Sequence, residues 1–272
     1  MTAFAMGPAL LFCPADRPDR YDKALGRADG VIVDLEDAVP PERKAGARAA
    51  VLDHPLDPAR TIVRINGFGT ADFADDLAML RSTGYRYVML PKADSTVDFS
   101  TLGEYAVVAL CETAAGVVAA AEVAAAAPVA ALMWGAEDLV VSMGGTSSRG
   151  PDGRYRGVIV QARASVAFAA AAHGVGMIDA VHLDITDQSG LAEEAADAAA
   201  LGFVATACIH PSQVPMIRDA YRPADVDVAW ARSVLTAVAT AGGGVVQHEG
   251  RMVDEPVLRH AETILRRAAA SG

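Results

Sequence analysis

The 272-residue chain is poor in cysteine, in aromatic residues and in positive charge. Its three cysteines, Cys13, Cys111 and Cys208, show neither the paired spacing of a zinc site nor a disulfide framework, so we expect them to be small buried side chains. With 23 Lys and Arg against 34 Asp and Glu, the net charge of −11 argues against nucleic acid or an anionic membrane as the main partner. An anionic ligand would need a local group of basic residues.

Long hydrophobic runs are also missing. No window reaches the roughly 18 uninterrupted apolar residues of a membrane span. The Ala-rich stretch from Ala114 to Ala136 comes closest, but Glu122 and Pro128 interrupt it. The first residues lack the basic start and long apolar stretch of a signal peptide. We therefore expect a cytoplasmic protein with no membrane contact.

Eight short apolar runs do recur along the chain, and nearly every run is followed by a residue able to do chemistry. Ala-rich stretches of helical period lie between them, so the expected order is strand, helix, strand throughout. This order and length favour an α/β fold, a (β/α)8 TIM barrel, which typically takes about 250 residues and carries its active site at the carboxyl ends of the strands. The expected strands are Ala9–Pro14, Val31–Leu35, Thr61–Ile65, Tyr87–Pro91, Val107–Cys111, Ala130–Ala136, Met177–Leu183 and Phe203–Ile209.

Two segments exceed what a barrel needs. The segment from Gly144 to Gly157 about doubles the interval between the sixth strand and the next helix, as is typical of a lid or binding loop. The tail contains an expected amphipathic helix from about Asp227 to Ala241, a turn at Glu249-Gly250 and a final helix. We therefore divide the chain into a barrel catalytic domain, residues 1–222, and a C-terminal helical extension, residues 223–272, that packs on a neighbouring subunit.

Two carboxylates follow neighbouring expected strands. Glu112 comes directly after the fifth strand, and Asp138 follows Gly135, Ala136 and Glu137 at the end of the sixth. Because adjacent strands lie about 4.8 Å apart, the two side chains could share one hard cation such as Mg²⁺. Acidic residues also often cap helices that begin just after a strand. Spacing alone leaves both interpretations open.

Arg64 lies inside an otherwise apolar strand. A guanidinium there costs several kcal/mol unless it is paired or reaches the open rim, and its planar fork matches a carboxylate. The alternative is an internal salt bridge to Glu36 or Asp37. Together, an arginine, a cation and an acidic rim describe a site for a small oxo acid or its enolate.

Other candidates are weaker. Lys92 could form a Schiff base, but nothing around it shows the apolar burial that lowers a lysine pKa, so we expect an ordinary rim charge. His210 either orients a ligand or caps the last strand. We expect structural roles for His173, His182 and Trp134.

Motifs in order over nearly the whole chain resemble the citrate lyase β-subunit-like proteins of the HpcH/HpaI aldolase superfamily. They are LFCPADRPDRYDKA, VIVDLEDAVPPERK, VRINGFGTADF, VMLPKAD, ALCETAAG, WGAEDL, CIHPSQ and MVDEP. Their number and order make the resemblance specific, whereas any one alone would be weak. It implies a (β/α)8 fold, a homo-oligomer that is usually a trimer, and Mg²⁺-dependent lyase chemistry on acyl-CoA thioesters.

The resemblance also implies roles for single residues. Glu112 of the ET motif and Asp138 of the GAEDL motif would bind magnesium. Arg64 of the RIN motif would bind the oxo-acid carboxylate, and Asp254 of the MVD motif would reach the site of an adjacent subunit. The catalytic candidates are Arg64, Asp37 and Asp254, and the substrate-binding candidates are Arg64, Glu112, Glu36, Gly135 and Ala136.

The implied reaction is cleavage of a 3-hydroxyacyl-CoA, of the malyl-, citramalyl- or hydroxymethylglutaryl-CoA type, to acetyl-CoA and an oxo acid, or the reverse condensation. Two alternatives stay open: a non-catalytic subunit of a citrate lyase-type assembly that binds oxo acid or CoA, and an aldolase acting on free hydroxy acids. Ala115 replaces an arginine of the family pattern and Thr206 a lysine, so we expect less positive charge at the mouth. Basic residues remaining near the expected rim are Arg17, Arg20, Lys23, Arg43, Lys44, Arg149, Arg154 and Arg156.

Overall fold

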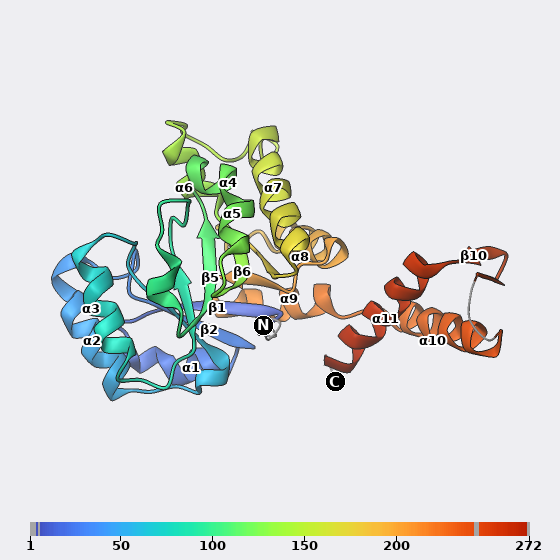
Figure 1. Cartoon of the computed structure of the whole chain (residues 1–272), viewed down its shortest axis with the longest axis horizontal. Helices are drawn as coiled ribbons and strands as arrows, with labels where there is room; N and C mark the ends of the chain where they lie inside the picture. Colours follow the sequence, from blue (N-terminus) through green and yellow to red (C-terminus); the bar gives the residue numbers. More distant parts are fainter. Residues whose placement is uncertain (1–3, 5, 242–244, 271–272) are drawn as a thin grey trace. The chain divides into compact units, whose positions relative to one another are not determined.

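The structure is a computed structural model that describes residue 4, residues 6–241 and residues 245–270 (Figure 1). Contacts divide the chain into two compact units, one ending at Ile217 and the other beginning at Arg218. In the first unit, eight parallel strands of the described chain close into a barrel in the order β1 to β8, and β8 pairs with β1. The predicted TIM barrel is therefore confirmed.

The barrel strands are short and mostly buried. They are β1 Ala9–Pro14, β2 Gly30–Asp34, β3 Thr61–Arg64, β4 Tyr87–Leu90, β5 Ala106–Cys111, β6 Val129–Trp134, β7 Gly176–Asp179 and β8 Ala205–Cys208. The predictions for the last three strands ran too far, because the apolar residues that follow each strand, Val181, Leu183 and Ile209 among them, line a cavity instead of continuing the sheet.

Helices alternate with these strands and cover the outside of the barrel (Figure 1). They are α1 Tyr21–Leu25, α2 Lys44–Asp53, α3 Ala71–Leu80, α4 Ala114–Val118, α5 Ala120–Ala125, α6 Ala136–Ser142, α7 Gly157–His173 and α8 Gln188–Leu201. Helix α9, Val214–Tyr221, begins in the first unit and ends in the second. Short 3-10 turns lie at Pro18–Arg20, Pro41–Arg43, Pro58–Arg60, Phe99–Leu102 and Pro211–Gln213. Local signals set several ends: the Asp187 carboxylate caps α8, and Gly202, in the left-handed conformation, ends it.

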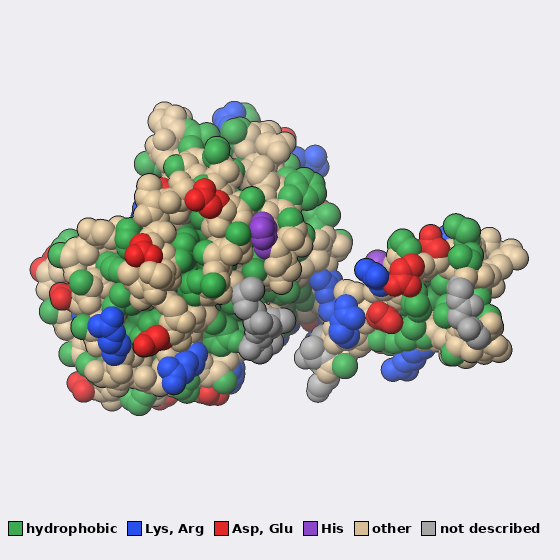
Figure 2. Space-filling model, viewed as in Figure 1, with side chains coloured by type: hydrophobic (Ala, Val, Ile, Leu, Met, Phe, Trp, Pro, Cys, Tyr) green, Lys and Arg blue, Asp and Glu red, His purple; other side chains and the backbone are tan. Residues whose placement is uncertain are grey.

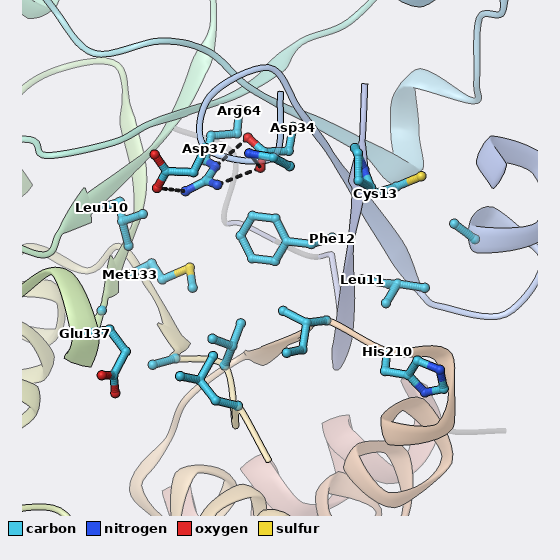
Figure 3. A pocket seen from close by; sticks show the side chains of 18 of the residues that line it. Leu11, Phe12, Cys13, Asp34, Asp37, Arg64, Leu110, Met133, Glu137 and His210 are labelled. Atoms are coloured by element: carbon cyan, nitrogen blue, oxygen red, sulfur yellow. Dashed lines mark hydrogen bonds and ion pairs between the residues drawn. The ribbon is translucent and has the colours of Figure 1, made fainter. Parts of the chain in front are cut away.

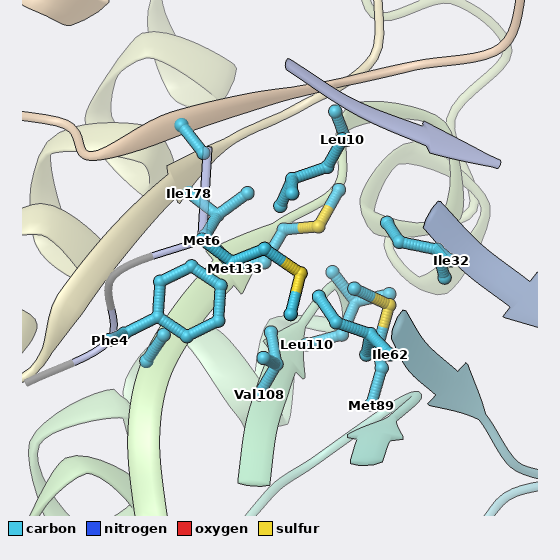
Figure 4. Close-up of a cluster of buried hydrophobic side chains, with 13 residues drawn as sticks. Phe4, Met6, Leu10, Ile32, Ile62, Met89, Val108, Leu110, Met133 and Ile178 are labelled. Carbon is cyan, nitrogen blue, oxygen red and sulfur yellow. The ribbon is translucent and has the colours of Figure 1, made fainter. Parts of the chain in front are cut away.

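The barrel interior is filled by aliphatic side chains and methionine (Figure 4). Phe4 and Met6, which precede β1, belong to this cluster. Gly30 leaves room for Met6, because a Cβ at Gly30 would lie 2.5 Å from the Met6 sulfur. Leu110 and Met133 belong to the same cluster and also line the cavity. The interior is therefore packed, and the space for a ligand lies beyond it.

The second unit has its own small core, formed by Ala231, Val234, Val253 and Ala261. Its elements are helix α10 Asp225–Thr240, strands β9 Val246–His248 and β10 Arg251–Val253, and helix α11 Glu255–Ala270. The predicted turn at Glu249-Gly250 connects β9 to β10, and both residues have positive φ, 49° and 76°.

Two composition-based predictions can be compared with the structure. All three cysteines are free and buried, as predicted. Figure 2 shows acidic and basic side chains interspersed on the face of the barrel that it presents. Among the described residues, no helix is long and apolar enough to cross a membrane.

Candidate active site

A cavity of about 930 Å³ opens at the carboxyl ends of the barrel strands (Figure 3). Strands β1, β2, β3, β5, β6, β7 and β8, or the residues directly after them, contribute to its wall. The predicted residues Asp37, Arg64, Glu112, Gly135, Ala136 and Asp138 all line it. The convergence of polar strand ends at one mouth is thus observed.

Arg64, the last residue of β3, is buried and bound by Asp34, the last residue of β2. Its Nε lies 2.7 Å from Asp34 Oδ1 and its second terminal nitrogen 2.6 Å from Oδ2. The Phe12 ring lies 5.0 Å from the guanidinium carbon. Burial disfavours the charge of Arg64, but the hydrogen bonds and charge of Asp34 raise its pKa. Arg64 is therefore a fixed cation in the cavity wall.

The internal salt bridge considered for Arg64 exists, but its main partner was missed. Glu36 Oε2 lies 3.1 Å from the first terminal nitrogen of Arg64, whereas Asp37 Oδ2 lies 4.0 Å from the same nitrogen. Asp34 also accepts hydrogen bonds from the main-chain amides of Glu36 and Ala38, at 2.9 and 3.1 Å. Asp34 thus orients both the arginine and the loop that carries Glu36 and Asp37.

Glu36 is shared between two cations. Besides Arg64, it contacts Lys92, whose Nζ lies 2.6 Å from Glu36 Oε1. Burial raises the pKa of Glu36, against the opposing charges of Arg64 and Lys92. Burial also favours the neutral amine of Lys92, yet the hydrogen bond and charge of Glu36 raise the pKa of Lys92. This direction opposes a Schiff-base role. The Lys92 side chain is 42% exposed, and its ammonium is paired with Glu36.

Glu112 follows β5 and is buried at the cavity wall. Its Oε1 accepts a hydrogen bond of 3.1 Å from the Lys92 main-chain amide. Burial and the nearby charge of Asp138 raise the pKa of Glu112 to about 8, against the opposing charges of Lys92 and Arg64. Such a buried carboxyl becomes an anion readily only when a cation approaches it.

Asp138 lies in the first turn of α6, whose N-terminal cap is Gly135. The Asp138 side chain is 39% exposed, and its Oδ1 lies 3.8 Å from Lys92 Nζ. Gly135 is needed for close approach, because a Cβ at this position would lie 3.0 Å from Glu112 Cβ and 3.1 Å from Glu112 Oε2. Gly135 therefore lets β6 and α6 lie close to the Glu112 carboxylate.

A buried polar network supports the DLED segment, residues 34–37, and the RIN segment, residues 64–66. The Lys44 ammonium donates to the carbonyls of Leu35 and Glu36, at 2.9 and 3.1 Å, and to the Asn66 side chain. Asn66 in turn donates to Asp76, a fully buried residue of α3. Lys44 was counted among the basic residues near the mouth, but it is buried and supports the loop from behind.

A hydrogen bond and an ion pair hold the loop from Gly144 to Gly157 to residues that precede and follow it in the chain. Ser148 donates to Glu137, the neighbour of Asp138, at 2.5 Å. Arg149 lies 3.7 Å over the Tyr155 ring and forms an ion pair of 2.6 Å with Glu194, which also contacts His182 at 2.8 Å. Arg149 therefore connects this loop to α8.

The remaining candidates fall in different places. His210 lines the cavity and caps the turn Pro211–Gln213, so both of its proposed roles stay open. Trp134 is buried and donates to Asp179 at 2.6 Å. Thr206 is buried inside β8. Ala115 is exposed in α4.

Asp254 belongs to the second unit, between β10 and α11. Its side chain accepts a hydrogen bond of 3.3 Å from the Val257 amide, as a residue that begins a helix commonly does. The residue is partly exposed, so its carboxylate remains accessible within this unit.

Sequence reasoning did not name Asp34 or Arg27, and it expected Lys92 to be only an ordinary rim charge. Arg27 lines the cavity together with Arg20 and Lys23, which belong to or flank α1. Asp34 opens the DLED motif, and the β2–β3 register makes it the partner of Arg64 across the sheet. That register was the signal that could have identified it.

A closed β/α barrel with an arginine and two carboxylates at its mouth is the active-site architecture of a TIM-barrel enzyme. Residues 9–211 match the family model described as HpcH/HpaI aldolase/citrate lyase, and residues 154–272 match the model of a carbon–carbon bond lyase of the TIM-barrel fold. The chain belongs to the HpcH/HpaI aldolase/citrate lyase family, as the motifs predicted.

Several relatives cover nearly the full length. A citrate lyase subunit beta-like protein of Mycobacterium tuberculosis is 56% identical, over 98% of both chains. The L-malyl-CoA/beta-methylmalyl-CoA lyase of Rhodobacter capsulatus is 32% identical, over 95% of this chain and 93% of that protein. A crystal structure of CitE from Mycobacterium tuberculosis, in complex with magnesium, acetoacetate and coenzyme A, superimposes with a TM-score of 0.91 at 56% identity, over 97% of this chain and 99% of that one.

Proposed function

We propose that this protein is a Mg²⁺-dependent lyase that cleaves a 3-hydroxyacyl-CoA to acetyl-CoA and an oxo acid, or runs the reverse condensation. The observation that carries the proposal is the meeting of Arg64, Glu112 and Asp138 in the wall of one cavity. The magnesium, oxo acid and coenzyme A bound by the Mycobacterium relative support it. So does the citrate lyase beta subunit of the same organism, 57% identical over 80% of this chain with a TM-score of 0.79, which was crystallised with oxaloacetate and magnesium.

The donor set fits magnesium. Glu112 and Asp138 offer carboxylate oxygens, and Mg²⁺ prefers one or two carboxylates with waters and ligand oxygens completing its shell. Among the described residues, no group of three or more His, Cys, Asp or Glu forms a closed metal cage. The raised pKa of buried Glu112 also fits a site that a cation completes. Bound Mg²⁺ would supply Lewis-acid polarisation of the oxo group.

Arg64 would hold the carboxylate of the oxo acid. Asp34 takes one edge of its guanidinium, and the remaining N–H groups can bind a carboxylate. The wall beside it is apolar, formed by Phe12, Leu110 and Met133. This wall suits the carbon chain of a malyl, citramalyl or hydroxymethylglutaryl group.

The reaction needs one proton removed and one delivered. In cleavage, a base takes the 3-hydroxyl proton as the C2–C3 bond breaks, and an acid then protonates C2 of the acetyl-CoA enolate. We assign Asp254 of an adjacent subunit to this proton transfer, in a homo-oligomer that we propose is a trimer. Asp37, whose side chain is 60% exposed beside Arg64, would exchange the proton with solvent.

The thioester would lie along the basic side of the cavity. Arg20, Lys23 and Arg27 line it on the α1 side and are exposed, so they can bind the phosphates of coenzyme A. These residues supply the local positive charge that an acidic protein needs for an anionic ligand. Free cysteines and a coenzyme A substrate favour a cytoplasmic location.

The test is incubation of purified protein and Mg²⁺ with malyl-, citramalyl- and hydroxymethylglutaryl-CoA, followed by mass detection of acetyl-CoA and the oxo acid. Cleavage should stop with EDTA and in Glu112→Gln and Asp138→Asn. Cleavage of the free hydroxy acids instead would favour the aldolase alternative. Coenzyme A binding without turnover of any ester would favour a non-catalytic subunit.

A further inference from the structure

Lys92 has an unusual main-chain conformation directly after β4. Its φ is 52°, in the left-handed region that residues other than glycine rarely adopt. Among the described non-glycine residues, only Glu249 also has a positive φ. Glu249 lies in a hairpin turn, whereas Lys92 lies at the site. The turn directs the Lys92 amide to Glu112 Oε1, 3.1 Å away. Non-glycine residues held in this region cluster at functional sites.

The Lys92 side chain extends this contact across the mouth. Its Nζ donates to Glu36 Oε1 at 2.6 Å and lies 3.8 Å from Asp138 Oδ1. The first distance is a charge-assisted hydrogen bond, and the second is a looser ion pair. Lys92 therefore touches three acidic residues that come from the ends of β2, β5 and β6.

Glu36 connects Lys92 to Arg64, because each of its two oxygens contacts one of these cations. Its other oxygen, Oε2, lies 3.1 Å from an Arg64 terminal nitrogen. With Lys92 present, Glu36 is held by both cations. Without the ammonium, the whole Glu36 carboxylate is free to turn to Arg64 and compete with the carboxylate of a ligand for the same N–H groups.

We propose that Lys92 is a positioning residue of the lyase reaction, whose ammonium engages one oxygen of Glu36, so that only the other oxygen contacts Arg64, and whose main-chain amide orients Glu112. This inference rests on the proposed function. It differs from an ordinary rim charge, whose loss would leave turnover unchanged, and from a catalytic residue, because Lys92 acts through Glu36 and Glu112.

The test compares Lys92→Met, Lys92→Arg and Arg86→Met. Arg86 is an exposed residue just before β4, at the opposite end of the same strand, so its substitution also removes one positive charge. We expect Lys92→Met to lower kcat about 100-fold and to raise the KM for the acyl-CoA ester about tenfold, because Arg64 both holds the carboxylate and orients the reacting end of the substrate. Lys92→Arg should recover at least tenfold, and Arg86→Met should match the wild type.

A second readout does not depend on turnover. Calorimetric titration with Mg²⁺ alone should show that Lys92→Met binds the ion at least as tightly as the wild type, because a cation next to Asp138 has been removed. Titration of the Mg²⁺-loaded protein with pyruvate should show at least tenfold weaker binding. General structural damage would weaken Mg²⁺ binding as well, and that result would overturn the proposal.

The two proposals fail in different ways. If the wild type cleaves an ester and Lys92→Met does so equally well, the role of Lys92 is wrong and the lyase function stands. If the wild type cleaves no ester, the lyase function fails. In that case the pyruvate titration still decides on Lys92, since equal pyruvate affinities in Lys92→Met and the wild type would overturn its positioning role.

Discussion

Replacing Asp34 by asparagine should destabilise the barrel strongly, although the change is nearly isosteric. Asp34 is 2% exposed, and its two oxygens accept four hydrogen bonds: two from Arg64 at 2.7 and 2.6 Å, and one each from the amides of Glu36 and Ala38. Asparagine presents one oxygen and turns an NH2 group toward some of these donors. Removing one partner of a buried ion pair typically costs about 3–5 kcal/mol.

We expect the lower end of that range, about 3 kcal/mol, because Glu36 remains 3.1 Å from Arg64 and keeps part of its charge balanced. The assay is urea unfolding followed by the fluorescence of Trp134, in a Trp230→Phe background that leaves the barrel tryptophan as the reporter. The oxo acid should also bind less tightly in this variant, since its arginine is no longer held in one orientation.

Asp37→Asn is the matched control. Its carboxylate lies 4.0 Å from the same guanidinium but is 60% exposed, so the substitution should change the unfolding free energy by no more than about 0.5 kcal/mol. If Asp34→Asn lies within about 1 kcal/mol of the wild type, Asp34 does not compensate the burial of Arg64, and the reasoning is refuted.

Three further predictions concern the rest of the site. Folding raises the pKa of Glu112 from 4.5 to about 8, so between these pH values the metal-free folded protein keeps a proton that the unfolded chain has lost. The free energy of unfolding should therefore fall as the pH rises from 4.5 to 8, by up to about 1.4 kcal/mol per pH unit. Thermal unfolding in EDTA should show this slope, and its persistence in Glu112→Gln would exclude Glu112 as the source. Gly135→Ala should lower kcat by about 10- to 100-fold, because its Cβ would displace Glu112, whereas Gly46→Ala, with no atom within 4 Å of its Cβ, should leave kcat unchanged. Mixed oligomers of inactive Asp254→Ala and Arg64→Ala protomers should recover some activity, and no recovery in verified mixed oligomers would argue against an intersubunit role for Asp254.

Much of the fold could be predicted because its signals are local. Short apolar runs separated by Ala-rich helical stretches identify strands and helices without reference to distant residues. Strand ends were less accurate where apolar residues continue past the ladder, as at Val181, Leu183 and Ile209. These side chains line the cavity instead of continuing the sheet, and Leu183 and Ile209 are exposed there.

The site could be predicted only in part. Arg64, Glu112 and Asp138 were identified because polar residues at strand ends are visible in the sequence, and they do line one cavity. The importance of Lys92 was not visible, because nothing in the LPKAD motif shows its left-handed main chain or its contact with Glu36. Lys44 was expected near the mouth because it follows the second strand. The sequence does not show whether its side chain points to the cavity or to the opposite side of the loop.

The sequence by itself determined the order of strands and helices, the carboxyl-end mouth and the acidic and basic residues that face it. Only the tertiary structure decided which of these residues pair. Strand register places Asp34 beside Arg64, and the close approach at Gly135 brings α6 to Glu112. The physical reason is that periodicity depends on neighbours along the chain, whereas ion pairs depend on distances between strands far apart in sequence, and a charge is stable in this wall only where those distances are short.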